Sequence, residues 1–177
     1  ATDTYRLALQ SLPLPELAEV TRTAIVSRRA LTELVRIVDA NSDEPVSIGI
    51  GDSQIEFKVG RITLGSRLIE GQFVNYPKVI PSSYERRIIA GVKELSTALD
   101  GVLVVAREDA NRVVLKTEGG LLHLTASSPD IGIAQAALPV TVEGDDAEMA
   151  FNARFMLEML DAAGAAEVVM ELSGPLN

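Results

Sequence analysis

The chain contains no cysteine, no tryptophan and a single histidine among its 177 residues. Without cysteine it forms no disulfide bond and offers no thiolate to a metal ion. His123 lies between two leucines, and the alternation of a strand would place it on the opposite face from them. The residues supply no cysteine–histidine or serine–histidine pair and no metal-ligand spacing, so we expect no catalytic site, no metal and no cofactor.

Aromatic residues are also scarce, at 4% of the chain, although hydrophobic residues reach 47%. A substantial but aliphatic core is therefore expected. No apolar run approaches the roughly 20 residues of a membrane-spanning helix, and no basic, apolar leader opens the chain. Together with the absence of cysteine, these features predict a cytoplasmic protein without a membrane partner.

Acidic residues are in excess, and they are unevenly distributed. Residues 1–81 hold 9 basic and 10 acidic side chains, whereas residues 82–177 hold 7 and 15. Phosphate binding depends on clustered lysine and arginine. This charge balance is therefore not that of an ordinary tight DNA-binding protein.

One stretch of the sequence, residues 71–81, separates two runs of strand-like texture. It begins at Gly71 and contains Pro77 and Pro81. Proline fixes φ and favours extended conformations in the residue before it, so we expect an ordered connector without repeating structure. Its side chains are too apolar for a flexible linker, and we expect it to pack against a surface. On composition alone, a plain domain junction is equally consistent with this stretch.

The apolar periodicity predicts short strands with helices among them. Ser27 is expected to cap the first helix, whose apolar stripe is Leu31, Leu34, Val35 and Val38. The expected helices are 28–40, 91–105 and 152–163. The expected strands are 4–12, 21–26, 46–50, 54–59, 62–68, 86–90, 112–116, 121–126, 131–140, 148–151 and 167–172.

An internal repeat supports this assignment. Residues 25–35 and 150–160 both run from an apolar strand end into a polar cap, Ser27 or Asn152, and then into a helix with an apolar stripe. Residues 91–105 are a weaker third copy. Closely spaced strands joined by tight polar turns indicate antiparallel sheets. The expected fold class is α+β.

Three segments, taken in order, form a more specific pattern. They are Ala1-Thr2-Asp3-x-x-Arg6-Leu7-Ala8, then Leu68-Ile69-Glu70-Gly71-x-Phe73-x-x-Tyr76-x-x-Val79-Ile80-Pro81, and then Phe151-Asn152 followed by Val168-Val169-Met170-Glu171-Leu172. In order and spacing this pattern resembles the bacterial replicative sliding clamp family, the β subunit of DNA polymerase III. The resemblance covers essentially the whole chain.

The resemblance implies a DNA-clamp fold of repeated β-α-β-β-β units, with antiparallel sheets outside and helices lining a central hole. Residues 1–81 would be the C-terminal half of the clamp's middle domain plus the interdomain connector, and residues 82–177 its C-terminal domain without the last strands. The first domain and half of the second would be absent. Thr4 stands where the family usually has glycine, and Pro77-Lys78 where it commonly has a basic pair.

In this family, replication proteins insert a short peptide into a pocket between the second and third domains. The resemblance assigns to that pocket Thr2, Thr4, Tyr5, Arg6, Leu7, Val74, Lys78, Val79 and Phe155. The apolar residues would hold aliphatic or aromatic anchors of the peptide, and the basic ones would orient its polar or acidic parts. Without the resemblance, the residues favour a plainer role in sealing a domain junction.

The resemblance further implies a ring that encircles duplex DNA without reading its sequence and that has no catalytic activity. Arg28, Arg29 and Arg36 would face the DNA through loose contacts, which suit a sliding protein. The plain alternative is a solvated helix face on which Glu33 pairs with Arg29. Closure of the ring as a homodimer would use Val104, Val105, Ile131 and Ile133.

The expected partners are double-stranded DNA, the DNA polymerase III α subunit, the clamp loader and other proteins with clamp-binding motifs. Two further classes stay open. One is a β-rich protein-interaction module whose connector groove binds a peptide without any role for DNA. The other is an enzyme with an unfamiliar site, against which the histidine and cysteine content counts.

Overall fold

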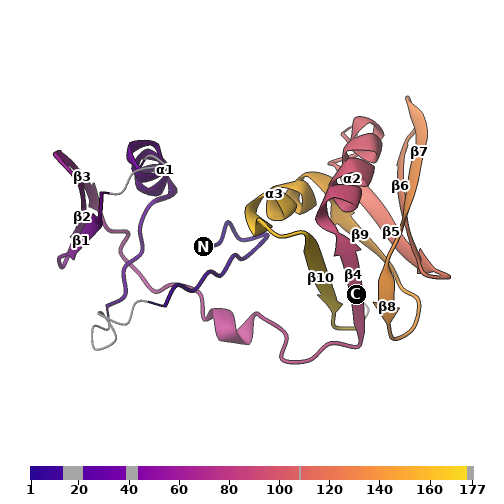
Figure 1. Ribbon diagram of the computed structural model, residues 1–177, viewed down its shortest axis with the longest axis horizontal. Coiled ribbons are helices and arrows are strands. Elements are labelled where there is room, and N and C mark those ends of the chain that lie inside the picture. The colour runs from indigo at the N-terminus through magenta and orange to yellow at the C-terminus, as the bar shows by residue number, and fades with distance from the viewer. Residues whose placement is uncertain (14–21, 39–43, 108, 175–177) are drawn as a thin grey trace. The chain divides into compact units, whose positions relative to one another are not determined.

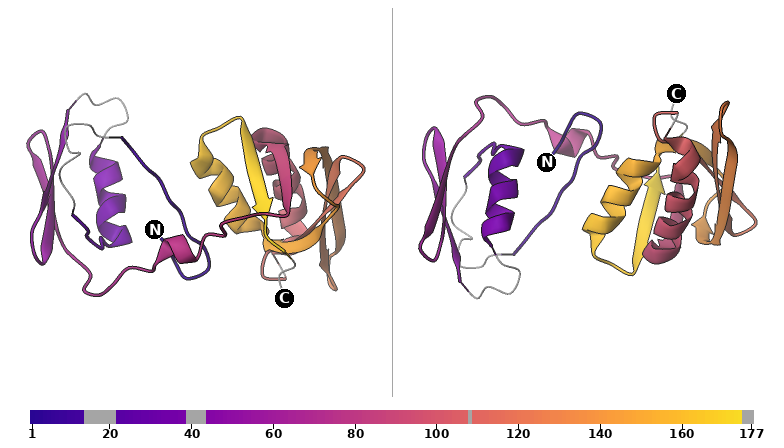
Figure 2. Two further views of the ribbon diagram at one scale, coloured as in Figure 1. Left: turned by 90° about the horizontal axis from the view of Figure 1, so that it is seen from below. Right: turned by 90° about the horizontal axis from the view of Figure 1, so that it is seen from above.

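The computed structural model describes residues 1–13, 22–38, 44–107 and 109–174 (Figures 1 and 2). The chain divides into two compact units, residues 1–79 and residues 80–177. Each unit combines helix with antiparallel sheet, as the α+β prediction requires. The domain boundary that we expect after Pro81 stays a prediction.

The described part of the first unit pairs a three-stranded sheet with helix α1 (Arg28–Ile37) (Figure 1). The sheet has the order β1-β2-β3, and its strands are β1 (Val46–Ile50), β2 (Gln54–Val59) and β3 (Ile62–Arg67). Strand β2 alternates exposed with buried side chains, and the buried ones are Ile55, Phe57 and Val59. These three strands match the sequence prediction closely, because a period of two is the expected signature of a strand with one covered face.

Helix α1 (Arg28–Ile37) begins as predicted but ends earlier than expected. Ser27 Oγ accepts a hydrogen bond from the Ala30 N–H at 3.3 Å, which confirms the predicted cap. Val38 already has extended backbone, with ψ at 105°. The rest of the predicted helix, residues 39–40, lies outside the described residues.

The apolar stripe predicted for α1 is only partly covered. Within the helix Ala30 is buried, whereas Leu31 is 42% exposed and Val35 is 73% exposed. The stripe lies on one face of the helix, as predicted, but these two side chains are exposed. Periodicity identified the apolar face of the helix correctly, but within this unit that face is not fully covered.

Two predicted strands of the first unit are absent as strands. Residues 4–12 form none, for reasons given below, and the predicted strand 21–26 is reduced in its described part to one bridge between Val26 and Leu68. The connector contains one turn of 3-10 helix, η2 (Tyr76–Lys78), and its apolar side chains are exposed rather than packed. The expectation that it lies against a surface is not met within its own unit.

The second unit contains two sheets and two helices (Figures 1 and 2). One sheet has the order β10-β4-β8, with β4 (Arg86–Gly91), β8 (Thr141–Glu143) and β10 (Glu167–Leu172). The other has the order β7-β6-β5-β9, with β5 (Arg112–Glu118), β6 (Leu121–Ser128), β7 (Gly132–Pro139) and β9 (Glu148–Asn152). The helices are α2 (Val92–Ala106) and α3 (Ala153–Ala163).

Helix α2 supplies much of the core of the second unit. It packs on β6 and β7 and contacts α3. Its side chains Leu95, Leu99 and Val102 are at most 1% exposed, and they belong to one cluster with Leu122 and Leu124 of β6. The core is thus aliphatic, as the scarcity of aromatic residues predicted.

Two details of the second unit bear on the sequence predictions. Asn152 Oδ1 accepts a hydrogen bond from the Phe155 N–H at 3.1 Å, so α3 begins with the same cap geometry as α1 and the repeat is confirmed there. The strand predicted over 131–140 ends at Pro139, and the chain then enters the other sheet as β8. His123 is half-buried opposite the fully buried Leu122 and Leu124, as predicted.

Candidate functional site

Residues 1–8 form a closed turn instead of the predicted strand. At its base the Ala8 N–H donates to the Ala1 carbonyl oxygen at 2.8 Å, and Thr2 pairs with Leu7 in an isolated antiparallel bridge. Inside the turn, Thr2 Oγ1 donates to the Arg6 carbonyl oxygen at 2.8 Å. The chain therefore reverses direction within a few residues, and we call residues 1–8 the N-terminal turn.

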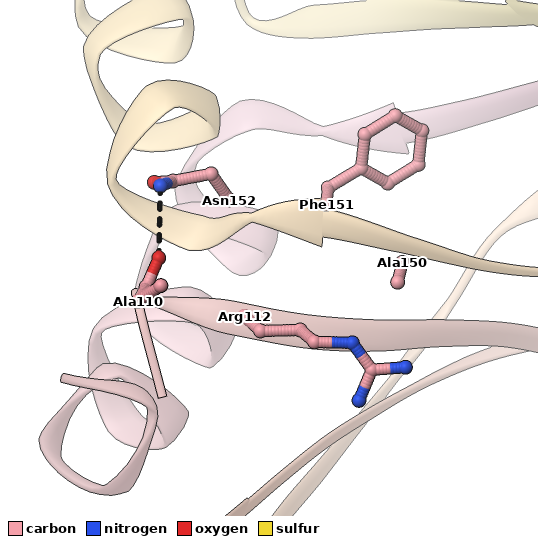
Figure 3. Close-up of a pocket in the computed structure, with 5 residues that line it drawn as sticks. All are labelled: Ala110, Arg112, Ala150, Phe151 and Asn152. Atoms are coloured by element: carbon pink, nitrogen blue, oxygen red, sulfur yellow. Dashed lines mark hydrogen bonds between the residues drawn. The ribbon is translucent and has the colours of Figure 1, made fainter. Parts of the chain in front are cut away.

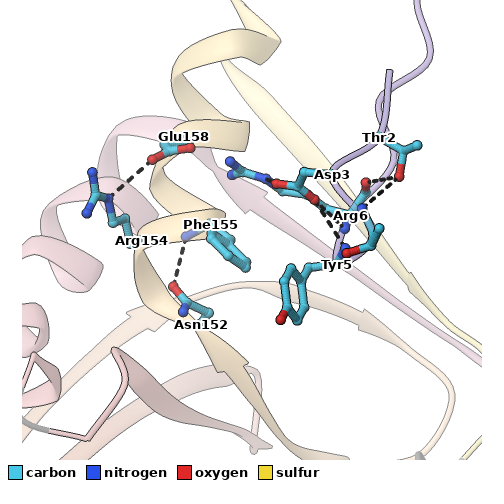
Figure 4. Close-up of polar contacts among 9 residues, drawn as sticks. Thr2, Asp3, Tyr5, Arg6, Asn152, Arg154, Phe155 and Glu158 are labelled. Carbon is cyan, nitrogen blue, oxygen red and sulfur yellow. Dashed lines mark hydrogen bonds and ion pairs between the residues drawn. The ribbon is translucent and has the colours of Figure 1, made fainter. Parts of the chain in front are cut away.

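Asp3 organises the tip of the N-terminal turn (Figure 4). Its Oδ1 accepts hydrogen bonds from the backbone N–H groups of Tyr5 at 3.2 Å and Arg6 at 3.0 Å. Its Oδ2 accepts one from Arg6 Nε at 3.0 Å. These bonds, and above all the one from the Arg6 side chain, lower the pKa of the Asp3 carboxyl below its ordinary value. The carboxylate thus fixes both the backbone of the turn and the side chain of Arg6.

Thr4 has an unusual backbone conformation at the tip of the turn. Its φ is +78°, a region that a β-branched residue adopts only under strain. The Thr4 N–H donates to Thr2 Oγ1 at 3.2 Å, and the next two backbone N–H groups, those of Tyr5 and Arg6, donate to Asp3 Oδ1. The turn therefore requires a left-handed residue here, which is consistent with the glycine that the family usually has at this place.

The predicted pocket residues of the first unit are mostly open to solvent. Tyr5 is 84% exposed and Val79 is 56% exposed, whereas Leu7 is half-buried. In the connector the Val79 N–H donates to the Tyr76 carbonyl oxygen at 2.9 Å and closes η2. The N-terminal turn and the connector therefore both present these side chains from hydrogen-bonded backbone, the first from a closed turn and the second next to the single 3-10 turn η2.

Phe155 is the predicted pocket residue that lies in the second unit. It is half-buried near the start of α3, where its N–H is held by the Asn152 cap (Figure 4). Next to Phe155 on α3, Arg154 Nε forms an ion pair with Glu158 Oε1, one helical turn further on, at 3.3 Å. The other predicted pocket residues, Thr2, Thr4, Tyr5, Arg6, Leu7, Val74, Lys78 and Val79, belong to the first unit. A common pocket therefore stays a prediction.

The predicted DNA-facing residues lie on the exposed side of α1. Arg28, Arg29 and Arg36 are all exposed. Arg36 Nη1 pairs with Glu33 Oε1 at 2.8 Å, so the acidic residue of this face pairs at i, i+3 with Arg36 and not with Arg29 as the plain alternative supposed. The face is basic and solvated, but its role toward DNA stays a prediction.

The residues predicted for ring closure differ in their exposure. Val104 on α2 is 64% exposed. Ile131, just before β7, is 53% exposed, and Ile133, within β7, is 72% exposed. Val105 is only 8% exposed and belongs to the core cluster. Three of the four side chains are therefore exposed, whereas Val105 offers a partner very little surface.

A shallow hollow of 230 Å³ lies where β5 and β9 meet the turn before β5 (Figure 3). It is lined by Ala110, Arg112, Ala150, Phe151 and Asn152, and Asn152 Nδ2 donates across it to the Ala110 carbonyl oxygen at 3.0 Å. None of the predicted site residues lines this hollow. Among the described residues, no cluster of three or more histidine, cysteine or acidic side chains could hold a metal ion. Of the described helices, none is long and apolar enough to cross a membrane.

The sequence matches two family models, one after the other. Residues 1–77 match the DNA polymerase III beta subunit, central domain, and residues 77–177 match the DNA polymerase III beta subunit, C-terminal domain. The chain belongs to the DNA polymerase III beta subunit family. This membership confirms the resemblance that the three sequence segments predicted.

Curated relatives of this beta subunit family agree. The beta sliding clamp of Staphylococcus aureus strain Mu50 is 33% identical over 179 residues, and the match covers 100% of this chain and 47% of the relative. That of Staphylococcus epidermidis has the same identity and coverage. The chain thus spans about half the length of the curated relatives that it matches.

Solved structures of beta subunits share the fold. The DNA polymerase sliding clamp of Bacillus subtilis superposes with a TM-score of 0.84 at 29% identity, covering 93% of this chain and 43% of that one. The DnaN sliding clamp of Bartonella birtlesii, solved bound to griselimycin, gives 0.80 at 31% identity and covers 85% and 40%. The predicted clamp fold class is therefore confirmed.

The sequence analysis did not single out Asp3, the residue that organises the N-terminal turn of this beta subunit chain. There Asp3 is only part of the family pattern, and the residues after it are expected to form a strand. The useful pattern was the aspartate itself, because an aspartate side chain commonly accepts hydrogen bonds from backbone N–H groups two and three residues further on. That pattern predicts a turn at Tyr5 and Arg6.

Proposed function

We propose that the chain is part of a DNA replication processivity factor, a ring-shaped sliding clamp that encircles duplex DNA and tethers a polymerase through a peptide-binding pocket. The observation that carries the proposal is the order of the two family models, central then C-terminal, which together span residues 1–177. Two such domains in this order leave no room within the chain for a separate catalytic domain. We infer a non-catalytic role.

The peptide pocket is proposed on the N-terminal turn, the connector and Phe155. The turn and the connector are ordered by their own backbone hydrogen bonds, yet they leave Tyr5, Val74 and Val79 between 41% and 84% exposed. Exposed apolar side chains on ordered backbone suit the anchors of a short linear peptide, because little conformational freedom is lost on binding. Arg6 supplies a charged group for a polar or acidic part of the peptide.

The proposed partners follow from this function. They are double-stranded DNA, the DNA polymerase III α subunit, the clamp loader and a second copy of the subunit. The exposed face of α1 with Arg28, Arg29 and Arg36 is proposed to meet the phosphates, and its loose, solvated character suits sliding. Val104, Ile131 and Ile133 are proposed to support ring closure. A clamp of this kind acts on chromosomal DNA, which in bacteria places it in the cytoplasm.

The pocket proposal is tested by fluorescence-anisotropy titration of this chain with a labelled peptide of the type Gln-Leu-x-Leu-Phe. We expect saturable binding that Arg6→Ala and Val79→Asp weaken by about tenfold or more. Arg36→Ala is the matched control, because Arg36 is also exposed and also paired with an acidic residue three positions earlier. Griselimycin, bound in the structure of the Bartonella birtlesii clamp, is a second probe, and displacement of the peptide by it would indicate one shared site.

A β-rich protein-interaction module without a DNA role is the second candidate. The net charge of −9 favours it, because a strongly acidic chain attracts phosphates poorly. A chimera in which this chain replaces the matched half of the Staphylococcus aureus clamp would separate the two. Retention of the chimera on circular but not on linear DNA, and its loss with Arg29→Glu plus Arg36→Glu, would support the clamp. Peptide binding with no retention on either DNA would support the module.

A further inference from the structure

We infer that Asp3 is a positioning residue of the peptide site, acting by holding the Arg6 guanidinium in one orientation. The inference rests on the proposed function, since it assumes that Arg6 meets the peptide. It concerns a residue that sequence reasoning left out of the site. The inference rests on the observation that the two carboxylate oxygens of Asp3 have different hydrogen-bond partners.

The two carboxylate oxygens of Asp3 bind different parts of the N-terminal turn. Oδ1 accepts the backbone N–H groups of Tyr5 and Arg6 and so fixes the turn. Oδ2 accepts Arg6 Nε at 3.0 Å and so fixes the side chain. Because a guanidinium group is planar, a bond through Nε restricts the direction in which the whole plane faces. A long, flexible side chain is thereby ordered before a ligand arrives.

Two effects of Asp3 on binding oppose each other. The negative charge of Asp3 offsets the positive charge of Arg6 and so weakens the attraction of an acidic peptide at a distance. Its hydrogen bonds reduce the freedom that Arg6 loses when the peptide binds. Both side chains are roughly 40–46% exposed, so water and salt screen the first effect strongly. The geometric effect is therefore expected to dominate, and loss of the Asp3 charge should weaken binding.

The chain offers a matched pair for comparison. Glu33 and Arg36 also form an exposed i, i+3 ion pair, at 2.8 Å, but it joins Arg36 through a terminal nitrogen. Glu33→Gln therefore removes a similar surface ion pair from the same unit. It controls for general effects of charge and salt on the titration.

The test is a double-mutant cycle on the 177-residue chain, read by the anisotropy of the labelled Gln-Leu-x-Leu-Phe peptide. Asp3→Asn keeps an oxygen for the turn amides but removes the charge that holds Nε. We expect it to weaken binding about three- to tenfold, and to have no further effect in the Arg6→Ala background. Glu33→Gln should stay within about twofold of the natural sequence.

A second measurement separates positioning from turn structure. Hydrogen exchange at the Tyr5 and Arg6 amides should stay close to that of the natural sequence in Asp3→Asn and accelerate in Asp3→Ala, which removes both acceptors. Weakened peptide binding in Asp3→Asn with unchanged exchange supports positioning. Weakened binding that appears only together with faster exchange assigns Asp3 to the turn alone and overturns the inference.

The remaining outcomes are also decisive. If the natural sequence binds and Arg6→Ala weakens binding while Asp3→Asn leaves it unchanged or tighter, the inference about Asp3 is overturned and the proposed function stands. If binding is insensitive to Arg6→Ala, Arg6 does not meet the peptide and the inference is overturned as well. If the natural sequence does not bind the peptide, the proposed pocket and the role of Asp3 both fall.

Discussion

Two adjacent valines of α2 should respond very differently to the same substitution. Val105 is 8% exposed and lies in the core cluster, whereas Val104 is 64% exposed. Replacement by alanine removes two methyl groups, each worth about 0.8 kcal/mol when buried, and at Val105 it also leaves a cavity. We expect Val105→Ala to lower the free energy of unfolding by about 2–3 kcal/mol, and Val104→Ala to change it by less than about 0.5 kcal/mol.

The comparison cancels the main confounding effect. Alanine favours helix over valine by a few tenths of a kcal/mol, but this gain is the same at both positions of one helix. Urea titration followed by far-ultraviolet circular dichroism is a suitable assay. Among the described helices the signal comes mainly from the second unit, because α2 and α3 hold 15 and 11 residues against 10 in α1.

A similar loss of stability in both variants would refute this account of α2. It would mean that Val104 packs as deeply as Val105, and Val104 would then be unavailable for the proposed contact between subunits. A large effect at Val104 alone would mean that the helix is rotated relative to its sheet. Only the expected difference between the two variants keeps Val104 in the proposed apolar patch with Ile131 and Ile133.

The remaining predictions also concern the second unit. Thr117 is 1% exposed, and its Oγ1 accepts a hydrogen bond from the Ala147 N–H at 2.8 Å. Thr117→Val should therefore lower the free energy of unfolding, measured by thermal denaturation, by about 1–3 kcal/mol, and Thr117→Ser should lower it clearly less. Gly144 has a φ of +93°, and a Cβ there would lie 2.7 Å from a backbone carbonyl oxygen. Gly144→Ala should therefore lower the urea midpoint more than Gly132→Ala, where φ is +116° but the space is open. Lys116 pairs with Glu118 at 2.9 Å, which raises the pKa of the lysine and lowers that of the glutamate. The stabilisation should be fully present between the ordinary values of 4.5 and 10.5 and be lost as pH falls through the lowered pKa or rises through the raised one. Glu118→Gln should remove both dependences in a stability profile against pH, and an unchanged profile would contradict the pairing.

The second unit was largely predictable from sequence. Its strands alternate in hydrophobicity because one face of each sheet lies on the helices, and burial in β6 follows that alternation residue by residue. The caps Ser27 and Asn152 were predictable too, since each needs only a polar side chain before an apolar helix. The break at Val140 between β7 and β8 was not predictable. The apolar pattern continues through it, and nothing in that pattern shows that β7 pairs with β6 whereas β8 pairs with β4.

The local structure around the predicted pocket residues was not predictable from the hydrophobic pattern. Tyr5, Leu7 and Leu9 alternate as in a strand, and this pattern suggested extended backbone. The carboxylate of Asp3 instead captures two backbone N–H groups that a strand would offer to a neighbour. A side chain that bonds its own backbone competes directly with sheet formation. Hydrophobic periodicity does not register that competition.

The exposed stripe of α1 shows a second limit of periodicity. A helix is about 10 Å across, and neighbouring strands lie about 4.8 Å apart, so one helix covers roughly two strands. In the first unit α1 packs on β3, and the inward residues of β2 are buried. All of β1 is exposed, even though Ile48 lies opposite the buried Phe57 on the same face of the sheet. An apolar pattern therefore predicts which face of a helix or strand is apolar. Whether that face is buried depends on how many other elements pack on it, and the pattern of a single element does not encode that number.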